Sequence, residues 1–323
     1  MEDPMTFAGS TAGFLAAAQA NAAILAYAKE DTYATVPAVA FQKTRFTGES
    51  FKPTNTRQRP DEINDLAESS QAVTTQISVS GTLSGALSVG TYDDLLGAVL
   101  CNDWGSDGTL RNGKVYKTWS IVEALGEKWF VRPGAICTSA QLTFSQGSFA
   151  QVSFDFTAAR QDPADTDPAS SYLDAPTGTV LDTVGNFGGV TIDGTTPDGC
   201  IRTLSIKLDR SGSGADYGTG HADACGVRHG ELEASGQIQM FFKTYDVYER
   251  YASGKGGPIA VTVTDGTGNG YVMTFLNAVL LNPQINAGSK NTSIMATFDI
   301  EGNPVVGGGT FLITKVKPAA PGG

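Results

Sequence analysis

Two stretches of the chain alternate apolar and polar residues in the same way. Gln76–Leu83 reads Gln-Ile-Ser-Val-Ser-Gly-Thr-Leu, and Glu231–Ile238 reads Glu-Leu-Glu-Ala-Ser-Gly-Gln-Ile. A period of two residues is typical of a strand with one face buried and the other in solvent. Because a Ser-Gly pair stands at the same position of both patterns, the sequence predicts one kind of strand used twice.

A Thr-Tyr-Asp tripeptide follows each of these strands, and the residues after it predict a short helix. In the first helix, Thr91 and Asp94 approximate a capping box, in which the Thr side chain accepts from a free N–H group. The second helix is predicted to be weaker and to end before Gly254. The apolar stripes consist of Tyr92, Leu95, Leu96, Val99 and Leu100 in the first helix, and of Tyr245, Tyr248 and Ala252 in the second.

Each predicted helix is followed by a hairpin and then by one more alternating strand. The hairpins pair residues 119–122 with 128–131, and residues 259–263 with 271–275. The closing strands point Val152, Phe154 and Phe156 to one side, and Ala296, Phe298 and Ile300 in the same way. Agreement of four elements in one order predicts an internal duplication.

This order divides the chain into five parts. We expect two copies of one mainly β unit, each with a short α-helix, at residues 41–160 and 198–302. Residues 1–40 are expected to form an N-terminal arm and a first strand, and residues 161–197 a linker or irregular loop. Residues 303–323 are expected to form a C-terminal arm with one strand at 310–316.

The composition of the chain argues against some classes of function. Charged residues are only 17% of the chain, so much of its surface must be covered by small polar residues or buried in an assembly. The net charge of −11 argues against a protein that binds nucleic acid, yet it suits one past which DNA slides. The four cysteines have no disulfide-framework spacing and predict reduced thiols. Neither a membrane-spanning run nor a signal peptide is expected.

Candidate chemical sites are few. His221, Cys225 and His229 are spaced four residues apart, but this matches no standard zinc pattern, and an exposed loop is the preferred interpretation. Asp265–Gly270 lacks the alternating acidic ligands of a calcium loop and predicts a hairpin turn. No nucleophile motif accompanies the two histidines. We therefore expect no catalytic residues, cofactor or metal, and no enzymatic activity.

Several motifs in their order resemble one known family. They are Phe46–Lys52, Ser80–Leu83, Gly90–Ala98 with Trp104, Ser235–Ile238 and Thr264–Tyr271. Together they are similar to the siphophage major tail tube protein family, over residues 41–104 and 230–300. In that family a Glu-Ile pair in the first long loop precedes an Arg-rich pattern, whereas Glu62-Ile63 here precedes Asn64-Asp65-Leu66. Ion pairs between rings are therefore not carried over to this loop.

The resemblance implies a β-sandwich or half-barrel with a flanking helix. Family members close into rings by joining their inner sheets, and the rings stack into a tube. Known tubes of this kind resemble a six-fold arrangement of one fold, so two copies in one chain predict a trimer with pseudo-six-fold symmetry. The implied partners are further copies, a tape-measure protein, and terminator and tip proteins, in a virion tail assembled in the host cytoplasm. DNA would cross the lumen without specific binding, and no membrane is involved.

Two groups of residues follow as candidates. Those expected to contact the next ring are Arg57, Arg59, Asp61, Glu62 and Asp65, and those expected to face the lumen are Ser78, Ser80, Glu233, Ser235, Gln237 and Gln239. An ordinary solvated sheet face is the alternative for the second group. Two other functions stay open: a tandem β-sandwich that binds carbohydrate or a cell surface, and a hydrolase with a metal at His221 and His229. The first predicts exposed aromatic side chains clustered over a cleft.

Overall fold

The computed structural model describes residues 17–63, 65 and 67–317, and strands dominate these ranges. Its helices are η1 (Ala20–Ala22, 3-10), α1 (Asp93–Leu100) and α2 (Asp246–Ala252). Its strands are β1 (Ile24–Lys29), β2 (Ala40–Lys43), β3 (Gly48–Glu49), β4 (Lys52–Gln58), β5 (Val73–Ala86), β6 (Thr109–Arg111), β7 (Trp119–Ala124), β8 (Trp129–Ser145), β9 (Gln151–Ala158), β10 (Asp162–Ala164), β11 (Ser171–Leu173), β12 (Phe187–Ile192), β13 (Ile201–Ser211), β14 (Gly214–Asp216), β15 (Gly226–Arg228), β16 (Glu231–Phe241), β17 (Gly257–Thr264), β18 (Gly270–Asn286), β19 (Met295–Gly302) and β20 (Phe311–Val316). The predicted mainly β fold is confirmed.

Eight antiparallel strands form one continuous sheet, which we call the inner sheet. Its order is β4–β5–β9–β8–β13–β16–β19–β18. The first four strands and the last four strands have the same order relative to their helix and hairpin, and β8 and β13 join them. We call these groups with their covering elements the first half and the second half.

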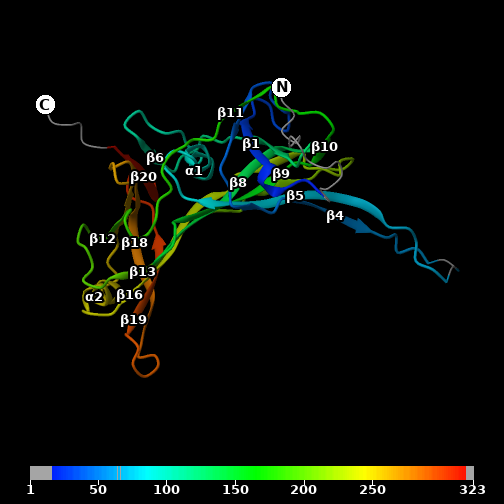
Figure 1. Cartoon of the computed structure of the whole chain (residues 1–323). Helices are drawn as coiled ribbons and strands as arrows, with labels where there is room; N and C mark the ends of the chain where they lie inside the picture. Colours follow the sequence, from blue (N-terminus) through cyan, green and yellow to red (C-terminus); the bar gives the residue numbers. More distant parts are fainter. Residues whose placement is uncertain (1–16, 64, 66, 318–323) are drawn as a thin grey trace.

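The two longest strands bend out of the inner sheet and begin the outer layer of each half (Figure 1). The first part of β8 pairs with β7 and β10, and β7 continues to β1, β2 and β11. The first part of β18 pairs with β17 and β20, which continue to β12 and β6. In both halves the hairpin register shifts by one residue, between Trp119 and Ile121 and between Gly257 and Ile259.

The core lies between the inner sheet and the outer layers. Val79 and Leu83 of β5, and Ala234 and Ile238 of β16, are buried there as the alternation predicted. The glycine of each Ser-Gly pair has a packing reason. A Cβ atom at Gly81 would lie 2.5 Å from the Phe51 Cα, and one at Gly236 would lie 2.5 Å from the Ser205 carbonyl oxygen. A side chain at either position would separate neighbouring strands.

Both helices lie where they were predicted, but the cap of α1 and the apolar stripe of α2 differ from the prediction. The capping box was wrong: no side chain caps α1, and the Thr91 hydroxyl instead accepts from Arg45 at 2.8 Å. The apolar stripe of α2 was also wrong, because Tyr245 is 63% exposed and the buried residue of this helix is Arg250. Gly254 follows the helix with φ +61°, the conformation that ends helices and favours glycine.

Segments expected to be loops or arms partly belong to the sheets. Residues 311–316, after the triple glycine, form β20 and pair with both β18 and β6. The long loop after β13 contains the β14–β15 hairpin and folds back on the first half. There the Ile77 N–H donates to the Ala222 carbonyl at 2.7 Å, and the Ala224 N–H donates to the Ala159 carbonyl at 3.3 Å. Of the N-terminal arm and first strand expected at residues 1–40, residues 1–16 lie outside the described residues.

Candidate functional site

The candidate site is the face of the inner sheet that points away from the core. The registers place Thr82 beside Asp155, Asp155 beside Ser139, and Ser139 beside Asp209. They continue from Asp209 to Glu233, and from Ser235 on that strand to Glu301. Since opposite residues of antiparallel strands share a face, polar side chains cover one continuous surface from β5 to β19. We call it the polar face.

The polar face carries the same hydrogen-bonded unit in both halves. Asp155 accepts from Thr82 and Ser139, both at 2.5 Å. Asp299 accepts from Gln237 and Asn282, both at 2.9 Å. These two donors hold the pKa of Asp299 below its usual range, because they stabilise the charged carboxylate. In each half one aspartate on the closing strand thus ties together the strands on its two sides.

Negative charge predominates on the polar face. Lys207 lies 3.5 Å from Asp209, and this exposed pair is weak. The acidic residues that the registers place on this face are Asp155, Asp209, Glu231, Glu233, Asp299 and Glu301, and the basic ones are Lys52 and Lys207. At neutral pH the surface repels phosphate groups.

The structure brings all six predicted lumen residues to the polar face. Ser78 and Ser80 lie on β5, at the far end of the face from the other four on β16. Five further acidic residues of the polar face were not among the candidates: Asp155, Asp209, Glu231, Asp299 and Glu301. The alternation of the closing strands contained the signal for two of them, because it sets Asp155 opposite to Phe154 and Asp299 opposite to Phe298.

Both edges of the inner sheet are open in the described part of the chain. β4 pairs only with β5, and its residues are exposed throughout. At the other edge, residues 279–286 of β18 pair with β19 on one side and with no described strand on the other. Unpaired edges are sites where another chain adds strands.

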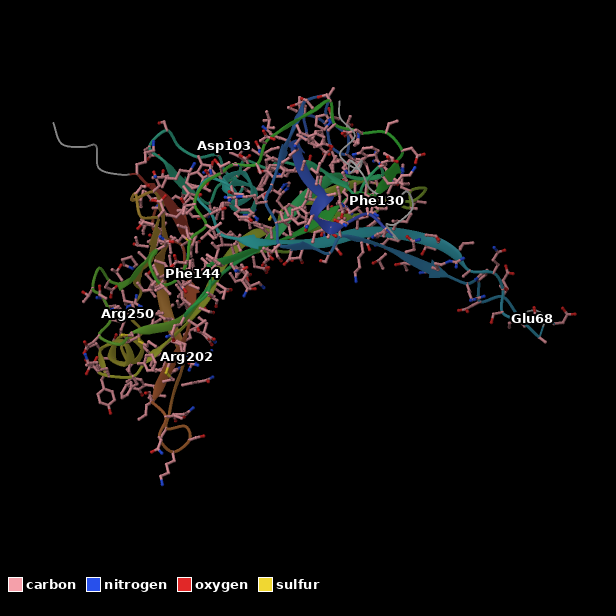
Figure 2. All side chains as sticks on the ribbon, viewed as in Figure 1. Glu68, Asp103, Phe130, Phe144, Arg202 and Arg250 are labelled. Carbon is pink, nitrogen blue, oxygen red and sulfur yellow. The ribbon has the colours of Figure 1, made fainter. Side chains whose placement is uncertain are left out.

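The β4–β5 hairpin extends as a long arm from one end of the molecule (Figure 1). The guanidinium groups of Arg57 and Arg59 donate to the carbonyls of Ala72 and Ser70, within the same hairpin. Asp61, Glu62 and Asp65 lie exposed at the tip, near Glu68, which Figure 2 shows at the far end of the arm. The five predicted inter-ring residues therefore share one projecting element, and the arginines stiffen it.

The residues of the alternative metal site do not come together. His229 Nε2 lies 3.0 Å from the Lys117 carbonyl oxygen, and its ring lies 4.9 Å from the ring of Tyr116. Among residues 17–317 as far as they are described, no three His, Cys, Asp or Glu side chains gather as metal ligands. The tryptophans 104, 119 and 129 are buried or half-buried, and the exposed aromatic side chains that contact one another are Tyr245 and Tyr248. No described helix has the length and apolar character needed to span a membrane.

A family model described as "Phage tail tube protein" matches residues 20–302, which include all eight strands of the inner sheet and the polar face. No curated protein matches the sequence.

Proposed function

Since the chain belongs to the phage tail tube protein family, we propose that three copies close into a pseudo-hexameric ring, and that the rings stack into the hollow conduit for phage DNA. The family comprises structural tail tube subunits of the virion. We propose the ring, its three-fold symmetry and the passage of DNA through it. The strand order supports it, because the two halves repeat one arrangement and the described residues leave one matching edge open at each end of the inner sheet.

The joint inside the chain is the template for the joint between chains. Within the chain, Gln141 of β8 lies opposite Lys207 of β13. Lys207 and Lys52 hold equivalent places, because they lie opposite Ser235 and Ser80 of the two Ser-Gly pairs. The matching closing strands likewise make Gln284 the equivalent of Gln141. The ring then pairs β18 of one copy with β4 of the next, with Gln284 opposite Lys52.

This pairing turns the polar face toward the lumen. The apolar face of the inner sheet is already covered by the outer layers, so ring closure leaves the acidic and hydroxyl groups on the inside. Six acidic side chains per copy repel the phosphates of passing DNA and prevent it from adhering. Ser78, Ser80, Glu233, Ser235, Gln237 and Gln239 are the lumen residues in this arrangement.

Stacking is assigned to the β4–β5 arm. Arg57, Arg59, Asp61, Glu62 and Asp65 on this arm would contact the neighbouring ring. The ends of the tube would bind the terminator and tip proteins, and the lumen would hold the tape-measure protein before ejection. Assembly would take place in the host cytoplasm, where Cys200 and Cys225 stay reduced.

Site-directed cross-linking tests the ring joint. In a background with Cys200→Ser and Cys225→Ser, the double variant Lys52→Cys with Gln284→Cys is concentrated, joined by a short thiol-reactive linker, and analysed on a denaturing gel. We expect covalent dimers and trimers, because cross-strand neighbours lie about 5 Å apart. Nothing larger is expected, because the third copy closes the ring. In the matched control, Glu68→Cys replaces Lys52→Cys and moves the thiol to the tip of the arm (Figure 2).

Electron microscopy of the same sample provides the second readout. Three-fold ring averages together with trimeric cross-links support the proposal. Rings of another symmetry, or equal cross-linking of the Glu68→Cys control, would contradict the assigned joint. Protein that stays monomeric at every concentration would contradict ring formation itself.

A further inference from the structure

A connecting segment completes the end of the first half. Beyond the paired parts of β5 and β9, the Leu87 N–H donates to the Ala150 carbonyl at 2.7 Å. Leu181 then inserts between them: the Ala150 N–H donates to the Leu181 carbonyl, and the Leu181 N–H donates to the Leu87 carbonyl, both at 2.9 Å. We call residues 176–183 the wedge segment. Leu87, Ala150 and Leu181 are all fully buried as a result.

The second half has the same opening without a wedge. The Phe242 N–H donates to the Ile294 carbonyl at 3.0 Å, just as Leu87 donates to Ala150. In the described part of the chain, no backbone group bonds to the Ile294 N–H or to the Phe242 carbonyl. Ile294 is 41% exposed, although its equivalent Ala150 is fully buried.

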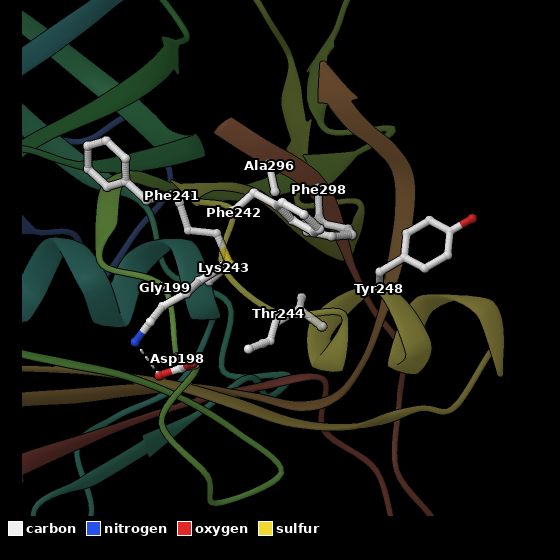
Figure 3. A pocket seen from close by; sticks show the side chains of 11 residues that line it. Asp198, Gly199, Phe241, Phe242, Lys243, Thr244, Tyr248, Ala296 and Phe298 are labelled. Atoms are coloured by element: carbon white, nitrogen blue, oxygen red, sulfur yellow. Dashed lines mark hydrogen bonds and ion pairs between the residues drawn. The ribbon is translucent and has the colours of Figure 1, made fainter. Parts of the chain in front are cut away.

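Exposed apolar side chains surround this opening. Figure 3 shows Phe242 and Phe298 at the base of a hollow, with Thr244 and Tyr248 at its side. Tyr245 and Tyr248 are 63% and 38% exposed. We call the opening and these side chains the end patch. In the first half, the residues of the matching site, Ser88, Thr91 and Tyr92, are buried.

The segment that matches the wedge lies at the start of the chain. The wedge segment precedes β12, and β12 pairs with β17 as β1 pairs with β7: Ile192 lies opposite Ile259, and Tyr27 opposite Ile121. Leu181 lies 11 residues before Ile192, and the residue 11 positions before Tyr27 is Ala16. Residues 11–18, Thr-Ala-Gly-Phe-Leu-Ala-Ala-Ala, are therefore the counterpart of the wedge segment, Pro-Thr-Gly-Thr-Val-Leu-Asp-Thr.

The two segments share the glycine that insertion requires. A Cβ atom at Gly178 would lie 1.8 Å from the Val89 carbonyl oxygen, so no side chain fits there. Gly13 stands at the same place in residues 11–18, and Phe14 and Leu15 follow it. The segment carries no charge, which suits an apolar end patch.

We propose that residues 11–18 of one copy insert into the end patch of the adjacent copy, as the wedge segment does within the chain. The proposal rests on the proposed ring, in which β1 of one copy lies next to the second half of its neighbour. Within one chain β1 belongs to the first half and lies apart from α2 (Figure 1), so we take a second copy as the receiver. The backbone of the inserted segment supplies hydrogen bonds, and Phe14 and Leu15 cover Tyr245, Tyr248 and Ile294.

Mixed single-cysteine chains test this exchange. In the background with Cys200→Ser and Cys225→Ser, one chain carries Leu15→Cys and the other Ile294→Cys. We expect covalent dimers in the mixture after ring formation and oxidation, and none from either chain alone. The control chain carries Val184→Cys, an exposed thiol beside the opening that the wedge segment already fills, and should give none with Leu15→Cys.

Gly13→Val provides an independent measurement. A side chain there blocks insertion, so the concentration needed for ring formation should rise by about tenfold or more. The melting temperature of the monomer should not change. Rings that form normally with Gly13→Val, or a mixture that gives Lys52–Gln284 cross-links but no Leu15–Ile294 dimers, would overturn the insertion and leave the ring intact. Absence of both rings and cross-links contradicts the proposed function and the insertion together.

Discussion

Helix α1 packs its apolar stripe into the core, with Leu95, Leu96, Val99 and Leu100 all buried, whereas α2 leaves Tyr248 38% exposed and buries the charged residue Arg250. Arg250 holds α2 in place: it bonds to Asp193 at 3.2 and 3.4 Å, and donates to the Ala278 carbonyl at 3.1 Å. Figure 2 shows Arg250 on α2, at the end of the molecule away from the β4–β5 arm. The two helices thus use different forces at matching places in the fold.

The difference follows from position in the chain. The first half borders the internal joint, so the second half and the connecting segments cover α1. Tyr271 of β18 donates to Asp93 at 2.7 Å, and Lys315 of β20 lies 2.6 Å from the same carboxylate. The second half borders an open edge, and there Tyr248 of α2 stays 38% exposed although the helix contacts β18. We propose that another copy of the chain covers the exposed side chains of the second half, which explains both observations.

The largest effect is expected at the matched positions Leu95 and Tyr248. Leu95→Ala removes a buried side chain and should lower the free energy of unfolding by about 2–5 kcal/mol. Tyr248→Ala removes a half-exposed side chain and should lower the free energy of unfolding of the monomer by less than about 1 kcal/mol. Denaturant titration of the monomers measures both values. Equal losses would remove the distinction between the helices.

Replacement of Arg250 tests the ionic attachment of α2. Arg250→Met keeps the aliphatic length but removes charged hydrogen bonds, and should cost about 1–3 kcal/mol of unfolding free energy. Asp193 is partly exposed and keeps Lys255 at 3.3 Å, so the loss is smaller than for a fully buried pair. Arg250→Lys serves as the control that keeps the charge, and a loss as large as that of Arg250→Met would mean that charge contributes little.

The glycines of the Ser-Gly pairs test what the halves have in common. Gly81→Ala and Gly236→Ala each force a methyl group against a neighbouring strand, and each should cost about 1–3 kcal/mol of unfolding free energy. Thermal unfolding of the two variants gives the comparison. A loss at only one glycine would show that the inner sheet is packed differently in the two halves.

The smallest effect is the pH dependence of the α2 attachment. Burial raises the pKa of Asp193, but the hydrogen bonds and charges of Arg250 and Lys255 outweigh it and leave the pKa below its usual range. A lowered carboxyl pKa adds stability above the unfolded-state value, which is lost as the pH falls through the folded-state value. The stability difference between wild type and Arg250→Met should therefore shrink below about pH 4. A difference that stays constant down to pH 2 would exclude Asp193 as the partner.

Several features could be predicted from sequence because they depend on local pattern. The alternation around Val79 and Ala234 sets which side of each strand is buried, whatever packs there. The same holds for the polar face at Ser80, Ser235 and Gln237. Prediction failed for the α2 stripe, since Tyr245 and Tyr248 have the spacing of a core face but contact neighbouring aromatic rings and stay 63% and 38% exposed. An apolar pattern predicts burial without saying which molecule provides it.

Local sequence patterns and composition were sufficient to predict the mainly β fold, the repeated order of its elements and the lack of net positive charge. Three features became visible only in three dimensions: β8 and β13 join the halves, Asp155 and Asp299 each bond to the strands on both sides, and the wedge segment fills one opening and leaves the other. Alternation reflects neighbouring residues, whereas strand pairing joins residues far apart in the chain. Such pairing depends on edges and openings that no local pattern records.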